Sequence, residues 1–185
     1  MPEITIYPST DALPPEFECQ IRAYIRFLWY DHYYYDLDEP LALAKSHPHY
    51  VVLAERHALI SAASIIWVYT ELDSKQFKIY GLGNVFTYPA FRKQSYGQQV
   101  VEAATHFIKS DNQADIAILF TDSTMEAFYA KSGWGQVSHF STFIGDKHNP
   151  EPKTDFTMMQ FLSERSQAYQ NTDKKYRLFL PDYSW

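Results

Sequence analysis

The sequence predicts a single mixed α/β domain, and three observations support this fold class. The chain has 185 residues, of which 46% are hydrophobic and 21% charged, so it can bury one full core. Three apolar and aromatic stretches, divided by short polar turns, read as successive strands between residues 50 and 89. A helical period then begins, and a short apolar strand follows it. An antiparallel half followed by a strand–helix–strand crossover forms a mixed sheet covered by helices.

The first elements are a strand, a helix and a meander. Alternation over Glu3–Tyr7 predicts a strand, and apolar residues at helical spacing from Phe17 to Leu28 predict an amphipathic helix. The polar and aromatic segment DHYYYDLDEP (residues 31–40) leads to a short helix-like stretch that ends near His47. The stretches YVVLAE, LISAASIIWVYTEL and FKIYGLGNVFTYP then predict three successive antiparallel strands.

The second half continues with a helix after Pro89, whose apolar face comprises Val100, Val101, Ala104, Phe107 and Ile108. IAILF is a short buried strand, and MEAFYAKSG is a short helix that ends at Gly133. Two further strands are expected near Gln136–Ile144 and Phe156–Leu162. The predicted order is therefore βααβββαβαββ in one domain of residues 1–162, followed by a C-terminal extension of residues 163–185 to which no element is assigned.

Composition excludes several classes of function. A formal charge of −6 and a pI near 5.6 argue against a nucleic-acid binder and suit a cationic partner. A single cysteine, Cys19, excludes an internal disulfide framework, and the scattered histidines predict no metal site. No apolar run is long enough to span a bilayer, so we expect a cytoplasmic protein without a membrane partner. A homodimer is compatible with the sequence.

The turn RKQSYG (residues 92–97) lies where the strand pattern changes to a helix. The first amides of a helix lack intrahelical partners and carry the positive end of the helix dipole, so such a turn can bind an anion. Arg92 and Lys93 add positive charge, although cations are slightly unfavourable at a helix N-terminus. The alternative is that both residues are simply solvated there, and spacing alone does not decide between the two.

Two motifs resemble those of the GNAT N-acetyltransferases. RKQSYG is similar to the family's Q/R-x-x-G-x-G/A signature, and FYAKSGW (residues 128–134) is similar to its later aromatic-tyrosine motif. The resemblance covers Tyr50 to Ile144 most clearly and implies a GNAT acyl-CoA N-acyltransferase fold that uses acetyl-CoA as co-substrate. FYAKSGW and the late MMQFL strand also show similarity to aminoglycoside N-acetyltransferases, without specifying a drug substrate.

The resemblance also implies which residues contact the cofactor. Backbone contacts to pantetheine fall on Val85, Phe86 and Thr87, and the turn that would hold the phosphates comprises Arg92, Lys93, Gln94, Ser95, Tyr96, Gly97 and Gln98. Ser95 stands where the signature has its first glycine, and we expect it to have a negative φ, so that glycine there would serve only close approach. Gly81 and Gly83 in the preceding strand indicate a bulge or a closely approached backbone.

The chemistry that the resemblance implies is attack of an amine on a thioester. A strand amide near Phe86 or Thr87 would stabilise the oxyanion, and Tyr129 would protonate the departing thiolate. The alternative for Tyr129 is a purely structural place in the core. No Asp or Glu lies between Phe77 and Tyr88, so the general base is not apparent.

Residue type alone leaves three candidate bases, namely Asp31, His32 and Glu71. Segment 31–40 combines acids and aromatic rings and suits an ammonium group, or else simply buries its tyrosines. We therefore expect an N-acetyltransferase that transfers an acetyl group directly to a primary amine of a small molecule or peptide. The alternative is a catalytically inactive module of the same fold that binds an acyl-CoA or a peptide.

Overall fold

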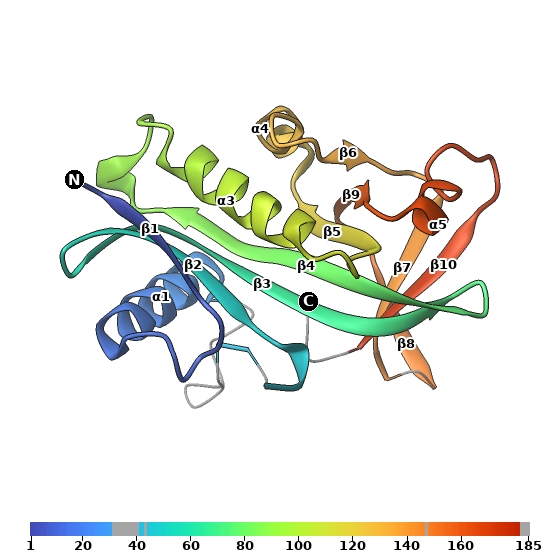
Figure 1. The fold of residues 1–185 in the computed structure, drawn as a ribbon, viewed down its shortest axis with the longest axis horizontal. Coiled ribbons are helices and arrows are strands. Elements are labelled where there is room, and N and C mark those ends of the chain that lie inside the picture. The colour runs from blue at the N-terminus through green and yellow to red at the C-terminus, as the bar shows by residue number, and fades with distance from the viewer. Residues whose placement is uncertain (31–40, 43, 147, 182–185) are drawn as a thin grey trace.

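The computed structural model describes residues 1–30, 41–42, 44–146 and 148–181, and it has a mixed α/β fold with two sheets (Figure 1). The larger sheet has seven strands in the order β1-β2-β3-β4-β5-β9-β6, and the smaller has three in the order β10-β7-β8. The strands are β1 Glu3–Tyr7, β2 His49–Glu55, β3 Ala58–Leu72, β4 Lys75–Thr87, β5 Ile116–Thr121, β6 Gly135–Gln136, β7 Phe140–Asp146, β8 Asn149–Lys153, β9 Phe156–Phe161 and β10 Tyr176–Pro181. The helices are α1 Pro15–Leu28, α3 Tyr96–Ser110, α4 Glu126–Ala130 and α5 Glu164–Gln167, with 3-10 turns η1 Ala44–Ser46, η2 Pro89–Phe91 and η3 Ser123–Met125.

The predicted fold class is confirmed. Strands β2, β3 and β4 form the expected antiparallel meander, and β4 pairs in parallel with β5 through the α3 crossover. Helices α3 and α1 cover opposite faces of the large sheet (Figure 1). No helix in the described ranges is both long and apolar enough to cross a membrane.

Three hydrophobic clusters hold these layers together. Under α3, Val100, Val101 and Ala104 pack on the sheet, and under α1, Phe17 and Ile21 do the same on its other face. The third cluster lies between the two sheets and contains Leu72, Phe77, Ile79, Ile116, Ile118, Phe140, Met159, Tyr169, Tyr176, Leu178 and Leu180. Burying such side chains contributes roughly 1.5–3 kcal/mol each, which is what fixes the smaller sheet against the larger.

The strand expected over Gln136–Ile144 is wrong as a single element. It is divided into β6, which pairs with β9, and β7, which is the central strand of the smaller sheet. The chain leaves the large sheet after Val137, whose N–H still donates to Thr157 O at 3.2 Å. At His139 the chain instead contacts the C-terminal segment that begins at Ser163, because His139 Nε2 lies 2.8 Å from Tyr169 O.

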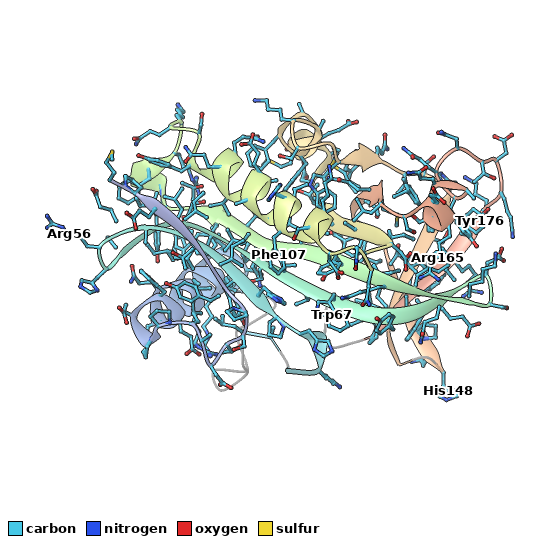
Figure 2. All side chains as sticks on the ribbon, viewed as in Figure 1. Arg56, Trp67, Phe107, His148, Arg165 and Tyr176 are labelled. Atoms are coloured by element: carbon cyan, nitrogen blue, oxygen red, sulfur yellow. The ribbon has the colours of Figure 1, made fainter. Side chains whose placement is uncertain are left out.

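Residues 163–181, to which no element was assigned, contain α5 and β10. Strand β10 pairs in parallel with β7, from Tyr176 opposite Phe140 to Pro181 opposite Gly145. Arg165 and Tyr176 lie at the same end of the molecule, where the smaller sheet packs (Figure 2). The Arg165 guanidinium pairs there with Asp115, a carboxylate that is almost completely buried. The division into a domain of residues 1–162 and an extension remains a prediction.

The short helix expected before His47 is only a 3-10 turn, Ala44–Ser46, in the part of the chain described. Residues 31–40, to which Asp31 and His32 belong, lie outside the described residues.

Candidate functional site

The two central strands of the large sheet separate toward their carboxyl ends. Strands β4 and β5 pair only where Ile79–Gly81 faces Ile116–Ile118. Beyond that point β4 runs on to Thr87 along β3, while β5 runs on to Thr121 along β9. Beyond Gly81 and Ile118 the two strands therefore no longer pair with each other, and a Cβ built on Gly83 would meet no atom within 4 Å.

A β-bulge in β4 changes the faces to which its residues point. Gly83 pairs with Ser64 and Phe86 with Ala62, so β4 carries one extra residue, and Asn84 in this stretch has a φ of 50°. The bulge that the glycines indicated is therefore present, with Asn84 in the left-handed conformation. It turns Phe86 toward α1, where its ring centroid lies 4.8 Å from that of Tyr24.

The end of β4 presents a free amide to the gap. Tyr88 N donates to Ile60 O at 3.0 Å, so the backbone groups of Tyr88 point toward β3. The backbone N–H and C=O of Phe86, two residues earlier, point toward β3 as well. The intervening Thr87 points its N–H and C=O away from β3 and toward the gap. Of the two amides expected to stabilise an oxyanion, the geometry thus favours that of Thr87 over that of Phe86.

The N-terminus of α3 lies next to this gap and has no side-chain cap. The Gln99 N–H donates to Ser95 O at 3.0 Å, which leaves the amides of Tyr96, Gly97 and Gln98 without intrahelical acceptors. The first turn of α3 contains no acidic residue, and Lys93 is exposed beside it. These are the properties of an anion-binding helix terminus.

The backbone of the turn is left-handed at two positions. Lys93 has a φ of 63° and Ser95 a φ of 61°. The expectation of a negative φ at Ser95 is therefore wrong, because Ser95 precedes the helix as its N-cap instead of belonging to its first turn. A glycine at this position would adopt the conformation without steric cost, whereas a residue with a Cβ is strained by roughly 1–2 kcal/mol.

Gly97 allows α3 to approach the end of β4. A Cβ at this position would lie 3.0 Å from Thr87 Oγ1 and 3.6 Å from Phe128 Cζ. Thr87 Oγ1 is itself fixed, since it lies 2.9 Å from Ser61 Oγ. Gly97 therefore lets the first turn of α3 lie close against the end of β4.

Arg92 connects the turn to the rest of the site. Its Nε donates to Thr87 O at 3.1 Å and its Nη2 donates to the Tyr24 hydroxyl at 3.3 Å. Tyr88 OH donates to Gln20 O of α1 at 3.0 Å. Helix α1 therefore supports the turn from the opposite face of the sheet, a role for Tyr24 and Gln20 that sequence analysis missed because the contacts span 68 residues.

Tyr129 lies in α4, in the cluster under α3, and is 7% exposed. Burial raises the pKa of its hydroxyl to about 12, against a smaller opposing effect of the hydrogen bond with Thr121. Protonation of a departing thiolate requires an environment that narrows the gap between the pKa of the phenol and a thiol pKa of ~8.5. Burial widens this gap instead, so Tyr129 is a fully protonated hydrogen-bond donor at neutral pH.

Gln98 joins the two motifs. Its Nε2 donates to Ser132 Oγ at 2.8 Å and to Glu102 Oε1 at 3.1 Å. Ser132 closes the helix of Tyr129, because Ser132 N donates to Tyr129 O at 2.9 Å. The first turn of α3 and the helix of Tyr129 are thus held together by one side chain.

Of the three candidate bases, Glu71 lies away from this site, whereas Asp31 and His32 belong to the segment outside the described residues. Glu71 pairs with Gln76 at the hairpin end of β4, about 23 Å from Gly83 along the strand at ~3.3 Å per residue. Asp122 caps η3 by accepting from Thr124 N at 2.8 Å. Among the described residues no group of three His, Cys, Asp or Glu side chains could hold a metal ion.

The model of the family described as Acetyltransferase (GNAT) domain matches residues 28–137, more than half of the chain, and both site motifs lie in or at the edge of this range. The chain therefore belongs to the GNAT acetyltransferase family. No curated protein sequence matches the chain significantly.

Solved structures of similar fold come from several bacteria. An acyl-CoA N-acyltransferase from Pseudomonas aeruginosa aligns with a TM-score of 0.59 and 15% identity, over 86% of this chain and 99% of that one. The GNAT family N-acetyltransferase YhbS from Escherichia coli, in complex with CoA, aligns with a TM-score of 0.58 and 11% identity, over 96% and 89% of the two chains. A GNAT family acetyltransferase from Staphylococcus aureus gives a TM-score of 0.55 and 14% identity, over 87% and 100%. At these identities the similarity establishes the fold.

Proposed function

We propose that the protein is an acetyl-CoA-dependent N-acetyltransferase that acts on a primary amine of a small molecule or peptide. The observation that carries the proposal is the uncapped N-terminus of α3 beside the open edge of β4. Pyrophosphate oxygens would accept from the amides of Tyr96, Gly97 and Gln98, and the pantetheine chain would run along β4 past Gly83. Lys93 would add a mobile positive charge.

The reaction would proceed by direct transfer. The neutral amine attacks the thioester carbonyl, the C–S bond breaks, and the excess proton of the amine passes to water or to a base. The Thr87 amide would donate to the oxyanion, and the Tyr129 hydroxyl would donate to the departing sulfur. Because the pKa of Tyr129 is about 12, full proton transfer to a thiolate of pKa ~8.5 would be uphill by about 5 kcal/mol in the free protein. Tyr129 would therefore act mainly as a hydrogen-bond donor to the departing sulfur, which would leave as a thiolate.

The first test is the melting temperature with and without acetyl-CoA. A ligand at ~100 times its Kd adds about 2.7 kcal/mol, which for this chain length raises Tm by roughly 5–10 °C. The same titration with Lys93→Ala should show a smaller rise. An unchanged Tm at millimolar acetyl-CoA would contradict the cofactor site.

A second candidate is an acyl-CoA or peptide binding module without catalysis, which is favoured by the absence of Asp and Glu between Phe77 and Tyr88. Thiol release from acetyl-CoA with a panel of amines separates the two. An enzyme should lose most of its turnover in Tyr129→Phe while it keeps its acetyl-CoA affinity. The matched control is Tyr169→Phe, at a buried tyrosine of the cluster between the two sheets. A module would bind acetyl-CoA and release no thiol with any amine.

A further inference from the structure

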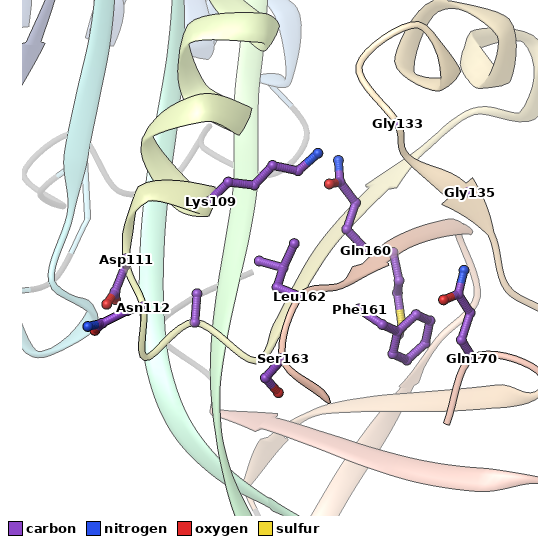
Figure 3. A pocket seen from close by; sticks show the side chains of 12 residues that line it. Lys109, Asp111, Asn112, Gly133, Gly135, Gln160, Phe161, Leu162, Ser163 and Gln170 are labelled. Atoms are coloured by element: carbon purple, nitrogen blue, oxygen red, sulfur yellow. The ribbon is translucent and has the colours of Figure 1, made fainter. Parts of the chain in front are cut away.

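A pocket lies at the end of α3 opposite to the turn of residues 92–97 (Figure 3). Its volume is about 520 Å³, which is within the range of small-molecule sites. The lining includes Lys109 and Asn112 at the end of α3, Gly133 and Gly135 after α4, and β9 with the turn that follows it. Lys109 lies 13 residues after Tyr96, so the pocket is about 20 Å from the first turn of α3 at ~1.5 Å per residue.

The floor of the pocket is an unpaired strand edge. Leu162 N donates to Asp115 O at 2.8 Å, whereas Thr157 O accepts from Val137 N on the other side of β9. Since the direction of the backbone groups alternates, Phe161 points its N–H and C=O away from β5. Strand β6 begins only at Gly135, opposite Met159, and so does not reach Phe161. Phe161 thus offers one donor and one acceptor to the pocket.

Two charged side chains line the pocket, the cation Lys109 and the carboxylate of Asp111. Lys109 is exposed, and no carboxylate of the described residues lies within the 4.0 Å of an ion pair with it. In Figure 3 its ammonium points across the pocket toward Gln160. The carboxylate of Asp111 also lines the pocket, but it is engaged, because it accepts from Lys78 Nζ at 2.6 Å and from Tyr80 OH at 2.7 Å.

The remaining polar groups divide into fixed and free ones. Gln160 is 7% exposed and its Nε2 donates to Ser132 O at 3.1 Å, which fixes the amide. The Ser163 hydroxyl donates to Asp115 Oδ1 at 2.6 Å. Asn112 and Gln170 contribute further side-chain amides at the pocket. A ligand would therefore meet a strand edge and a cation, with amides around them.

We propose that this pocket binds an N-acylated α-amino acid. The N–H of the ligand would donate to Phe161 O, and its carboxylate would accept from Phe161 N and from the Lys109 ammonium. This is the pairing of an added β-strand one residue long, with the charge of the C-terminal carboxylate matched by lysine. The proposal does not rest on the acetyltransferase activity.

The test uses N-acetyl-L-alanine and, as the matched uncharged probe, N-acetyl-L-alaninamide. Each is titrated into the full chain and followed through the backbone amide signals of Phe161 and Gly135 in ¹⁵N–¹H spectra. We expect saturable shifts at both residues, with the acid binding about threefold to fivefold more tightly than the amide, as for a partly exposed ion pair.

Two exposed lysines provide the variants. Lys109→Gln should remove the preference for the acid, and Lys131→Gln, at the end of α4 and outside the pocket, should retain it. Saturation with acetyl-CoA should leave the shifts at Phe161 in place. The proposal is overturned by an absence of saturable shifts at Phe161, by equal affinities for acid and amide, or by an undiminished preference in Lys109→Gln.

Discussion

The contact between Gly97 and Thr87 makes Gly97→Ala the most informative substitution in the site. The added Cβ would lie 3.0 Å from Thr87 Oγ1, closer than ordinary van der Waals contact. The hydroxyl cannot move freely, because it lies 2.9 Å from Ser61 Oγ, which in turn donates to Phe86 O at 2.7 Å. Either α3 moves away from β4, or Thr87 changes rotamer and loses its partner.

The magnitude follows from two opposing effects. Overpacking of this kind costs about 1–3 kcal/mol, while replacing glycine by alanine in a helix returns up to ~1 kcal/mol. We expect a net destabilisation of about 1–2 kcal/mol, which lowers Tm by about 2–8 °C at this chain length. Because the substitution displaces the helix terminus, acetyl-CoA should also stabilise the variant less than it stabilises the parent.

The assay is a double-mutant cycle with Thr87→Ala, measured by urea denaturation. Thr87→Ala removes the same hydrogen bond whether position 97 is Gly or Ala. It relieves a clash only where position 97 is Ala. Gly97→Ala should then be neutral or stabilising by up to ~1 kcal/mol in the Thr87→Ala background. Gly135→Ala, whose Cβ would lie 4.0 Å from the nearest atom, is the control. An equal cost of Gly97→Ala in both backgrounds would refute the contact.

Three further predictions concern backbone strain and protonation. Ser95→Gly should stabilise the protein by about 0.5–1 kcal/mol because φ is 61° there, whereas Ser110→Gly within α3 should destabilise it, and thermal unfolding of both variants compares the signs. Burial alone would raise the pKa of Asp115, but hydrogen bonds from Arg165 and its neighbours outweigh burial and lower it. The stability that Asp115 contributes is therefore complete above about pH 4 and is lost as the pH falls below that value. Asp115→Asn should lower the free energy of unfolding by about 2 kcal/mol at pH 7. In a plot of Tm against pH, the variant should also show a smaller fall on the acid side. Because burial raises the pKa of Tyr129 to about 12, turnover should show no loss from ionisation of this residue up to about pH 10. A fall in turnover near pH 9 that is absent in Tyr129→Phe would contradict this.

The elements that sequence analysis predicted well are those with a clear local pattern. Strands β2, β3 and β4 are apolar runs divided by short polar turns, and α3 has apolar residues at helical spacing. The switch between the two patterns located the turn at Arg92–Gly97. The glycines of β4 indicated a bulge for the same local reason, since a strand interior rarely carries glycine without a cause.

Elements that depend on distant partners were not predictable. Strand β8 has the sequence NPEPK, and two prolines argue against a strand unless it lies at a sheet edge, as this one does. Strand β10 is short, and it is defined by parallel pairing with β7 instead of by a hairpin turn. The φ of Ser95 depends on whether the helix starts at Ser95 or at Tyr96, and helix boundaries are uncertain by one or two residues even in structures.

Because of the bulge at Asn84, the number of residues in β4 decides which face of the sheet each later side chain reaches. Loss of one residue there would restore uninterrupted alternation, and every side chain from Val85 to Thr87 would move to the opposite face of the sheet. Phe86 would leave Tyr24, and Thr87 would leave Gly97. We therefore expect relatives of this protein to keep Asn, Asp or Gly at position 84, because these residues tolerate a positive φ, and to accept no deletion beside it. An alignment gap in this strand would identify a chain in which the end of β4 meets α3 differently.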